Sequence, residues 1–427
     1  MATTSEEAEA PWEELLGSNN WDTLLDPLNL SLRQLILRCG DFCQAAHDAF
    51  NSDQYSKYCG SSRYCKSTFF HKVMLESASD YVVSSFLYAT ARLSLPESFL
   101  LHSKSREKWD RESNWVGYIA VTSDARTKAL GRREIYVVWR GTNRKYEWVD
   151  VLGAELTSAE CLLHPITDQS KLIKSDSGGG NMLGCFLHLL CSCRDDDKEK
   201  TPKVMLGWLT LYISDDSKSQ FTKQSARTQL LSRINSLIEQ YKNENPSIIF
   251  TGHSLGASLS IISAMDVAEN VTDDIPVAAF VFGCPRVGNK AFKERIERHK
   301  NLNILHIRNA IDFIPHYPIK LLGYVYIGTE LVIDTRKSNC LKKSKNPGDW
   351  HNLQALLHVV AGWNGEKGEF ELKVKRSLAL VNKSSDFLKD EYSVPGSWWV
   401  EKNKGLVRNE DGEWLCAPPD DDDMPVP

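Results

Sequence analysis

The run Gly252-His253-Ser254-Leu255-Gly256 places a serine two residues away from a glycine on either side. A serine hydroxyl attacks an acyl carbonyl efficiently only when a base removes its proton and its oxygen projects toward the substrate. A tight turn from a strand into a helix provides that projection, and the flanking residues must be small because strand and helix close on each other there. The run therefore predicts that Ser254 is the nucleophile of an acyl-transfer reaction.

The neighbouring segments supply the strand and the helix that such a turn needs. An apolar, β-branched run over 247–251 predicts a strand before the serine, and an amphipathic pattern from Leu255 to Glu269 predicts a helix after it. Strand and helix patterns then alternate with short connections, which indicates parallel crossovers in an α/β sheet. The other predicted elements are strands at 116–122, 134–139, 277–282, 303–308, 324–327 and 331–334, and helices at 224–242, 289–299 and 350–361.

An acid and then a base are expected after the nucleophile in the chain order of this turn type. Asp312 comes just after the predicted strand 303–308 and just before a proline, so we predict it as the catalytic acid. Asp334, which also follows a predicted strand, and Asp349, which precedes a histidine, are the alternatives.

Five histidines follow the predicted helix of the nucleophile. His299 and His306 precede the acid, and His316 is too close to it in sequence to reach around the site. His351 and His358 remain, seven residues apart in the predicted helix 350–361. His351 stands at the start of that helix, where a loop can bring it over the sheet, whereas His358 is flanked by leucines and valines as a core residue would be. We therefore predict His351 as the base.

Two backbone N–H groups are needed to stabilise the oxyanion of a tetrahedral intermediate. The N–H of Leu255, directly after the nucleophile, is the first candidate. The second is expected in the loop after an earlier strand, and Arg140-Gly141-Thr142 ends the predicted strand 134–139. Gly141 permits a close approach, so the Thr142 N–H is predicted as the second donor, with its hydroxyl able to assist.

Charge and composition exclude several other classes of protein. A formal net charge of −5 over 427 residues argues against a nucleic-acid-binding face. No cluster of histidines and carboxylates has metal-ligand spacing, so no metal or cofactor is expected. The acidic first ten residues lack an apolar core, and no apolar run approaches the roughly 18 residues of a membrane span. Eleven scattered cysteines are typical of free thiols, and a cytosolic location is expected.

One domain is expected over residues 1–417. Helical patterns over 11–65 predict a helical layer on its core, and the poorly periodic stretch 157–200 predicts a surface insertion, partly mobile. The last residues, 418–427, are rich in Asp and Pro and predict a disordered acidic tail.

These residues together resemble the class 3 lipases, the fungal triacylglycerol-lipase type of α/β-hydrolase. The resemblance narrows to plant phospholipase A1 group II and its delta-like branch, and it covers nearly the whole chain outside the insertion and the tail. The segments that carry it are 11–17, 132–136, 138–142, 203–208, 251–256, 282–289, the Asp312 region, 351–355, 359–363 and 395–400. It implies a central, mostly parallel mixed sheet flanked by helices, with Ser254, Asp312 and His351 as the catalytic triad.

The resemblance further implies an enzyme that cleaves the sn-1 acyl ester of glycerophospholipids such as phosphatidylcholine, at a membrane or micelle surface. A galactolipid or neutral acylglycerol lipase with the same triad is the alternative, and a lipase-like signalling or scaffold protein is a further one. Family members have a lid after the oxyanion strand, which corresponds here to about 143–156. Its apolar residues, expected to cover the site in water, are Tyr146, Trp148, Val149, Val151 and Leu152. Oligomeric state does not follow from the sequence.

Overall fold

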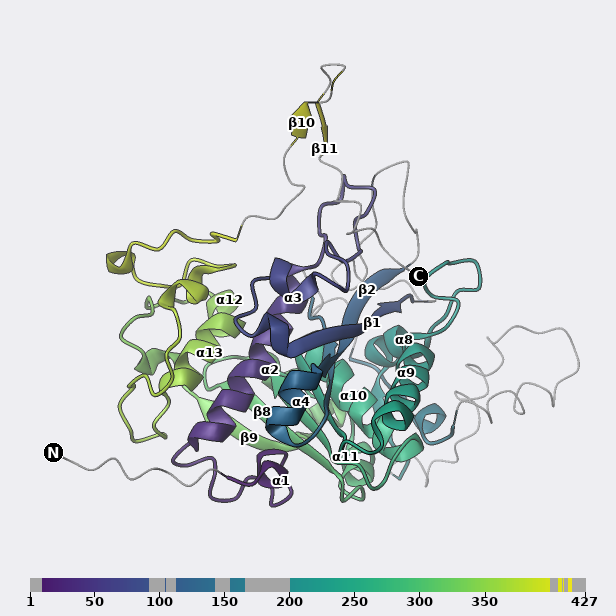
Figure 1. Cartoon of the computed structure of the whole chain (residues 1–427). Coiled ribbons are helices and arrows are strands. Elements are labelled where there is room, and N and C mark those ends of the chain that lie inside the picture. Colours follow the sequence, from purple (N-terminus) through teal and green to yellow (C-terminus); the bar gives the residue numbers. More distant parts are fainter. Residues whose placement is uncertain are drawn as a thin grey trace, which may run out of the picture.

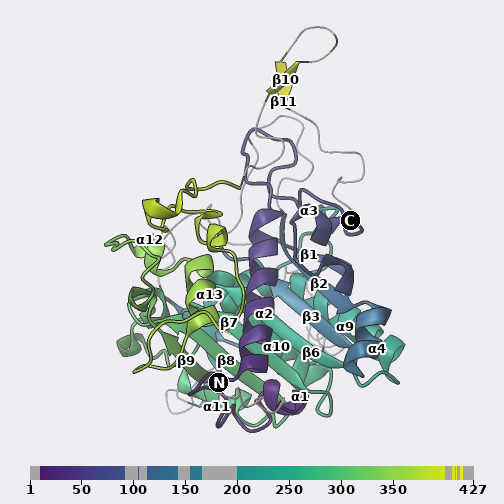
Figure 2. The same ribbon diagram turned by 60° about the vertical axis from the view of Figure 1, so that its left-hand side comes forward.

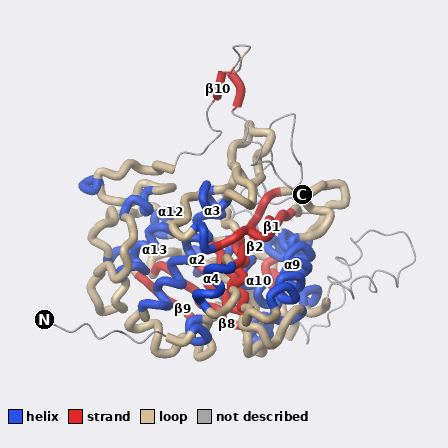
Figure 3. Tube along the Cα trace, viewed as in Figure 1, coloured by secondary structure: helices blue, strands red, loops and turns tan. Residues whose placement is uncertain are grey.

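The protein is described from a computed structural model, in which residues 10–91, 104, 113–142, 154–165, 200–399, 406–408, 410 and 414–416 are placed. A central sheet runs through this part of the chain with helices on both of its sides (Figure 1). Strands drawn in red lie between helices drawn in blue when the chain is coloured by secondary structure (Figure 3).

The sheet has seven strands in the order β1-β2-β3-β6-β7-β8-β9. The β1–β2 and β2–β3 pairs are antiparallel, and every later pair is parallel. This mixed, mostly parallel sheet confirms the predicted fold class. Its strands are β1 (Tyr81–Ala89), β2 (Asn114–Thr122), β3 (Glu134–Trp139), β6 (Ser247–His253), β7 (Val277–Phe282), β8 (Leu302–Asn309) and β9 (Thr329–Ile333).

Both faces of the sheet are buried, and each face belongs to a separate apolar cluster. In β3, Tyr136 and Val138 pack in one cluster while Ile135 and Val137 pack in the other, because successive side chains of a strand point to opposite faces. The parallel strands are apolar at nearly every position for the same reason.

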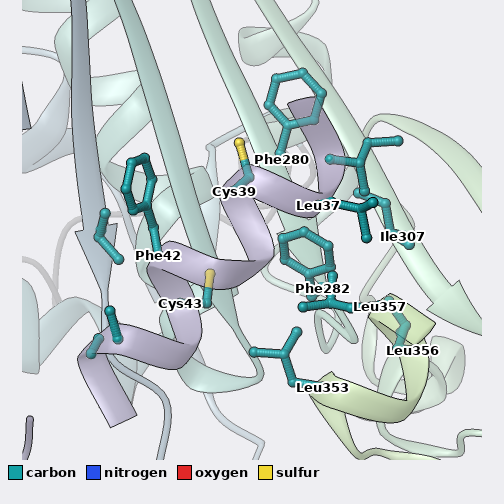
Figure 4. Packing of buried hydrophobic residues seen from close by; sticks show 14 of the residues in the cluster. Leu37, Cys39, Phe42, Cys43, Phe280, Phe282, Ile307, Leu353, Leu356 and Leu357 are labelled. Atoms are coloured by element: carbon teal, nitrogen blue, oxygen red, sulfur yellow. The ribbon is translucent and has the colours of Figure 1, made fainter. Parts of the chain in front are cut away.

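Helices α2 (Leu30–Asp48) and α13 (Leu353–Gly362) cover the first face, and they lie side by side across it (Figure 2). Gly40 of α2 lies against the side chain of Leu357 of α13, where a larger residue would collide. Buried Arg33 of α2 donates hydrogen bonds to the carbonyls of Val360 and Trp363, at 2.5 and 2.8 Å. The close-up of this contact shows leucines of α13 beside α2 and the strands (Figure 4).

Four helices cover the second face, and a buried ion pair joins two of them. Arg227 Nε lies 2.8 Å from Asp266, and the Tyr212 hydroxyl donates to the same carboxylate at 2.8 Å. Because each charge has a partner, the pair can remain inside the core. The helices are α8 (Leu206–Ile213), α9 (Ala226–Tyr241), α10 (Leu255–Asn270) and α11 (Lys290–Ile296).

Short elements complete the described chain. The helices are α1 (Trp12–Leu15), α3 (Phe69–Lys72), α4 (Asp124–Leu130) and α12 (Pro347–Trp350), and the strand pairs are β4 (Leu156–Ser158) with β5 (Lys203–Met205) and β10 (Leu406–Arg408) with β11 (Trp414–Cys416). The 3₁₀ helices are η1 (Ala78–Asp80), η2 (Glu160–Leu162), η5 (Ile314–His316), η6 (Lys320–Leu322), η7 (Thr335–Lys337), η8 (Leu378–Asn382) and η9 (Asp390–Tyr392). Among the described residues, no helix is long and apolar enough to cross a bilayer.

The structure differs from the predicted elements in three segments. The surface insertion was expected to begin at residue 157, but 157–158 belong to β4, and Ala159 and Leu162 are fully buried. Residues 166–199 and the tail 418–427 lie outside the described residues. The segment 324–327 is not a strand, since Val325 donates its N–H to the Gly288 carbonyl instead of pairing in the sheet. The predicted helix 350–361 is in fact α12, a turn, and α13.

Candidate active site

Ser254 occupies the turn between β6 and α10, with φ 58° and ψ −123°. A non-glycine residue in this region of backbone space is strained, and the surrounding structure must hold it there. Both flanking glycines are required by packing. A Cβ on Gly252 would collide with the backbone of Gly256, and a Cβ on Gly256 would collide with the carbonyl of Trp139. The predicted strand-turn-helix geometry is therefore present.

Asp312 and His351 are in direct contact. The Nδ1 of His351 donates to Oδ2 of Asp312 at 2.5 Å, and the Ile314 N–H donates to the other carboxylate oxygen at 3.0 Å. The carboxylate is 1% exposed and the imidazole 10%. A buried carboxylate on Nδ1 fixes the tautomer of the ring and leaves Nε2 to act as a base.

The two alternative acids are engaged elsewhere. Asp334 accepts from the backbone N–H of Arg336 at 2.9 Å and pairs with its guanidinium. Asp349 accepts from the Ser344 hydroxyl at 2.5 Å. The structure thus brings Asp312 to the predicted base, rather than Asp334 or Asp349.

The end of β7 brings the nucleophile and the Asp312–His351 pair to one place. Ser254 donates its N–H to the carbonyl of Phe282 at 3.0 Å. The next residue, Gly283, has φ 53°, and a Cβ on it would lie 2.7 Å from Cε1 of His351 and 3.3 Å from Oδ2 of Asp312. Only a residue without a side chain leaves room for the imidazole here. The turn that holds Ser254 and the Asp312–His351 pair therefore both border the end of β7, at the carboxyl-terminal edge of the sheet.

His351 itself lies in the turn between α12 and α13, not on the helix that carries His358. His358 is buried in α13, where its Nε2 lies 2.8 Å from the Ser338 hydroxyl. The prediction that His358 packs in the core is confirmed, whereas the prediction of one helix for both histidines was wrong.

His253, directly before the nucleophile, was not predicted to have a role. Its Nε2 donates to the backbone carbonyl of His351 at 3.0 Å, and the two rings lie 4.5 Å apart between centroids. Burial first, and then the neighbouring His351 and His47, hold the pKa of His253 well below its usual value. The ring is therefore neutral and does not place a second positive charge beside the base.

The two predicted oxyanion donors lie close to the nucleophile turn. Leu255 is the first residue of α10, and the first amides of a helix have no carbonyl partner within the helix. Gly141 packs so closely that a Cβ would lie 2.7 Å from the His253 carbonyl, and Thr142 follows it, half-buried. Arg140, stacked 3.7 Å above the ring of Phe50, donates to the Gly141 carbonyl at 2.8 Å and fixes this loop.

Asn309 and His306, both on β8, also support the site, and no role was predicted for them from the sequence. The Asn309 side chain, fully buried, donates to the carbonyl of Trp350, the residue before His351, at 2.8 Å, and to the Thr335 hydroxyl at 3.0 Å. Nε2 of His306 accepts from the N–H of Cys284 at 2.9 Å, beside Gly283. Their residue types within a strand give no indication of these roles, because the partners belong to loops elsewhere in the sequence.

The proposed lid residues Tyr146, Trp148, Val149, Val151 and Leu152 lie outside the described residues. Within the part of the chain that is placed, no group of three or more His, Cys, Asp or Glu could hold a metal ion.

The mixed sheet, the serine at a strained strand-to-helix turn and the Asp–His pair that follows it define an α/β-hydrolase of the lipase type. A family model described as lipase (class 3) matches residues 136–322. Phospholipase A1-IIdelta of Arabidopsis thaliana is 63% identical over 426 residues, covering 100% of each chain. Phospholipase A1-II 5 of Oryza sativa subsp. japonica is 47% identical, covering 98% of this chain and 85% of that protein. The chain belongs to the class 3 lipase family and, within it, to plant phospholipase A1 group II.

Solved lipase structures are more distant. The lipase from Rhizopus microsporus var. chinensis is 18% identical with a TM-score of 0.42, covering 72% of this chain and 76% of that one. Lipase II from Rhizopus niveus is 16% identical with a TM-score of 0.41, covering 72% and 83%. The family membership makes the protein a carboxylic-ester hydrolase of the lipase type.

Proposed function

We propose that the protein hydrolyses the sn-1 acyl ester of glycerophospholipids such as phosphatidylcholine. The observation that carries the proposal is the contact of His351 with buried Asp312 at the sheet edge where Ser254 is held with a positive φ. A relative 63% identical over its whole length bears the name phospholipase A1, which supports this ester over others.

In the proposed mechanism His351 Nε2 takes the proton of the Ser254 hydroxyl as the oxygen attacks the ester carbonyl. The tetrahedral intermediate collapses, the imidazolium protonates the leaving sn-1 oxygen, and lysophospholipid departs. Water then attacks the acyl-enzyme with the same base, and the fatty acid is released. Asp312 holds the tautomer of the imidazole and stabilises its positive charge.

Developing negative charge on the carbonyl oxygen is proposed to be stabilised by the N–H groups of Leu255 and Thr142. The Leu255 amide stands at the N-terminus of α10, whose dipole also favours an anion there. The contact of Gly141 with the His253 carbonyl supports the placement of the second donor, since it draws the Thr142 loop to the nucleophile turn.

The test is hydrolysis of a mixed-chain phosphatidylcholine by the parent protein and by Ser254→Ala. The parent should release the fatty acid of the sn-1 position, and the variant should lose several orders of magnitude in kcat with an unchanged thermal unfolding temperature. Release of the sn-2 chain would contradict the proposed regiochemistry, and near-parental activity of the variant would remove the nucleophile assignment. Parallel assays on monogalactosyl lipid and triacylglycerol decide between this reaction and that of a galactolipid or neutral lipase.

A reducing compartment is proposed for the protein, and the cytosol is the simplest one. Buried Cys39 and Cys43, on neighbouring turns of α2, are free thiols, and so is buried Cys284. Proteins of oxidising compartments tend to pair their cysteines, which supports the proposal. Fractionation of cells that express the full chain, with detection of the protein in the soluble or the organelle fraction, tests it.

A further inference from the structure

The chain that leaves the catalytic acid carries a concentration of exposed apolar side chains. We call residues 313–323 the post-acid loop, because it begins directly after Asp312. Single exposed apolar residues are ordinary on protein surfaces, but a group on one loop is not. The exposed fractions are 37% for Phe313, 53% for Ile319, 89% for Leu321 and 48% for Leu322.

The first part of the post-acid loop is fixed against the active site. Ile314 donates its N–H to the carboxylate of Asp312 at 3.0 Å. Arg286, three residues after the glycine that accommodates His351, donates to the carbonyls of His316 and Pro318, at 2.7 and 2.6 Å. These hydrogen bonds hold the backbone from which Ile319 and Leu321 project, so the apolar group has a fixed place beside the site.

The far end of the loop lies beside residues 154–156. The Tyr324 hydroxyl donates to the Ala154 carbonyl at 3.3 Å, and a Cβ on Gly323 would lie 3.3 Å from Cδ1 of Leu156. The exposed Leu321 and Leu322 therefore lie between Asp312, the proposed acid, and β4, the strand that follows Thr142 in the sequence.

The charged residues of the loop and of the residues after it indicate which kind of surface it binds. Residues 313–329 contain no Asp or Glu, although the chain has 56 of them in 427 residues, and exposed Lys320 lies among the apolar side chains. The half-buried tyrosines Tyr317 and Tyr326 accompany it. Apolar tips with a cation and aromatic rings, and without negative charge, suit the phosphate and acyl boundary of a phospholipid surface.

We propose that the post-acid loop is the docking surface for the phospholipid aggregate, with Ile319, Leu321 and Leu322 inserted below the headgroups beside the catalytic site. The proposal rests on the proposed phospholipase function, because that function makes the substrate a component of the docked surface. Docking through this loop brings the lipid ester to the edge of the sheet where Ser254 lies.

Binding to lipid is tested apart from catalysis in the Ser254→Ala background. Full-length protein is sedimented with phosphatidylcholine vesicles, and the double substitution Ile319→Asp, Leu321→Asp should lower the partition coefficient at least tenfold. The matched control is Leu372→Asp. Leu372 is 43% exposed and lies beyond Gly362, at the end of α13 away from His351, and its substitution should leave the partition coefficient within twofold. Partition of the double variant equal to that of the parent would overturn the proposal.

Kinetics with intact Ser254 separate failure of this proposal from failure of the proposed function. The loop substitutions should lower kcat/KM on vesicles at least tenfold more than on dibutyrylphosphatidylcholine, which is dissolved as single molecules. Equal losses on the two substrates would also overturn docking through the loop. A parent protein that binds vesicles through the loop but hydrolyses neither phospholipid would support the docking surface and refute the phospholipase assignment.

Discussion

The imidazole of His253 donates a hydrogen bond to the backbone carbonyl of His351, so the residue before the nucleophile holds the backbone of the base. The two groups are 3.0 Å apart, and the rings are in contact. The strained turn therefore holds two of the three proposed catalytic residues: Ser254 through its own backbone, and His351 through the side chain of His253.

Replacing His253 by Ala should lower kcat by about 10- to 100-fold, because small displacements of a catalytic base are costly. The hydrogen bond to the His351 carbonyl is lost, while Ser254, Asp312 and His351 remain. His253→Gln, whose amide can donate to the same carbonyl, should recover part of the rate. Stopped-flow measurement of the acylation rate checks both variants, and an acylation rate of His253→Ala equal to that of the parent would contradict a positioning role.

Asp312→Asn should lower kcat by about three to four orders of magnitude, as it removes the charge that stabilises the imidazolium and the acceptor that selects its tautomer. Asp334→Asn and Asp349→Asn are the matched controls, since neither carboxylate contacts His351 in its hydrogen bonds. Each control should change kcat less than about threefold. If Asp312→Asn kept the parental kcat and one of the control variants lost activity, the aspartate at that control position would be the catalytic acid instead.

Gly283→Ala should lower kcat/KM by at least about 100-fold, because the added methyl group meets the imidazole of His351. Gly131 provides an unusually close control. It also has a positive φ, 70°, but a Cβ there has no neighbour within 4 Å. Both substitutions should cost about 1–2 kcal/mol of unfolding free energy through backbone strain, and only Gly283→Ala should lower activity. Parallel denaturant titrations and initial rates show whether the two effects separate.

Asn309→Ala should destabilise the protein by about 1–3 kcal/mol, since it leaves the buried carbonyl of Trp350 and the Thr335 hydroxyl without their donor. Trp350 precedes His351, so loss of this hydrogen bond should also displace His351 and lower kcat about tenfold. The rate is measured well below the unfolding temperature, where the variant is folded. Thr335→Val is the informative comparison, as it removes one partner of Asn309 without touching the Trp350 carbonyl. If both variants lose stability but keep full kcat, Asn309 is only structural.

Stability should fall on acidification, and His306 should account for a defined part of the loss. Burial, opposed by Glu330 and reinforced by Arg308, lowers the pKa of His306 to about 4. Folding thus favours the neutral form of His306. The contribution of this group to the free energy of unfolding is complete above its unfolded pKa of 6.5, and it is lost as the pH falls toward 4. At pH 4.5 the loss is about 2 kcal/mol for this group.

His306→Gln should therefore show a smaller difference in unfolding free energy between pH 7 and pH 4.5 than the parent, by about 2 kcal/mol. Urea unfolding at the two pH values measures it. His71→Gln, at an exposed position, serves as control. An identical pH difference in His306→Gln and the parent would mean that His306 does not titrate with unfolding in this range.

Most strands of the sheet and the strand-turn-helix geometry at Ser254 could be predicted from the sequence because their signals are local. The parallel strands are short, apolar and bounded by turn residues, and Ser254 has glycines at both required positions. Strand β1 was missed since register shifts between Val83 and Ser85 and between Leu87 and Tyr88 break its alternation. Conversely, the run 324–327 is aromatic and β-branched, and Tyr324 and Ile327 are buried, but no strand among the described residues pairs with it.

The support of the site could not be predicted, because it is made by hydrogen bonds between distant segments. Asn309 and Trp350 are 41 residues apart, and His253 and His351 are 98 apart. A polar side chain at the end of a strand is equally typical of a turn, so only the folded structure distinguishes the two roles.

The packing of α2 against α13 has a consequence for synthesis of the chain. Arg33 and the Val360 carbonyl that it binds are separated by 327 residues. At about 5–20 residues per second, a ribosome needs roughly 15–65 seconds to make the second after the first. During that interval the apolar side of α2 cannot pack against α13, because α13 has not yet been made. Helix α2 is therefore a segment that a chaperone can bind during most of the synthesis of the chain.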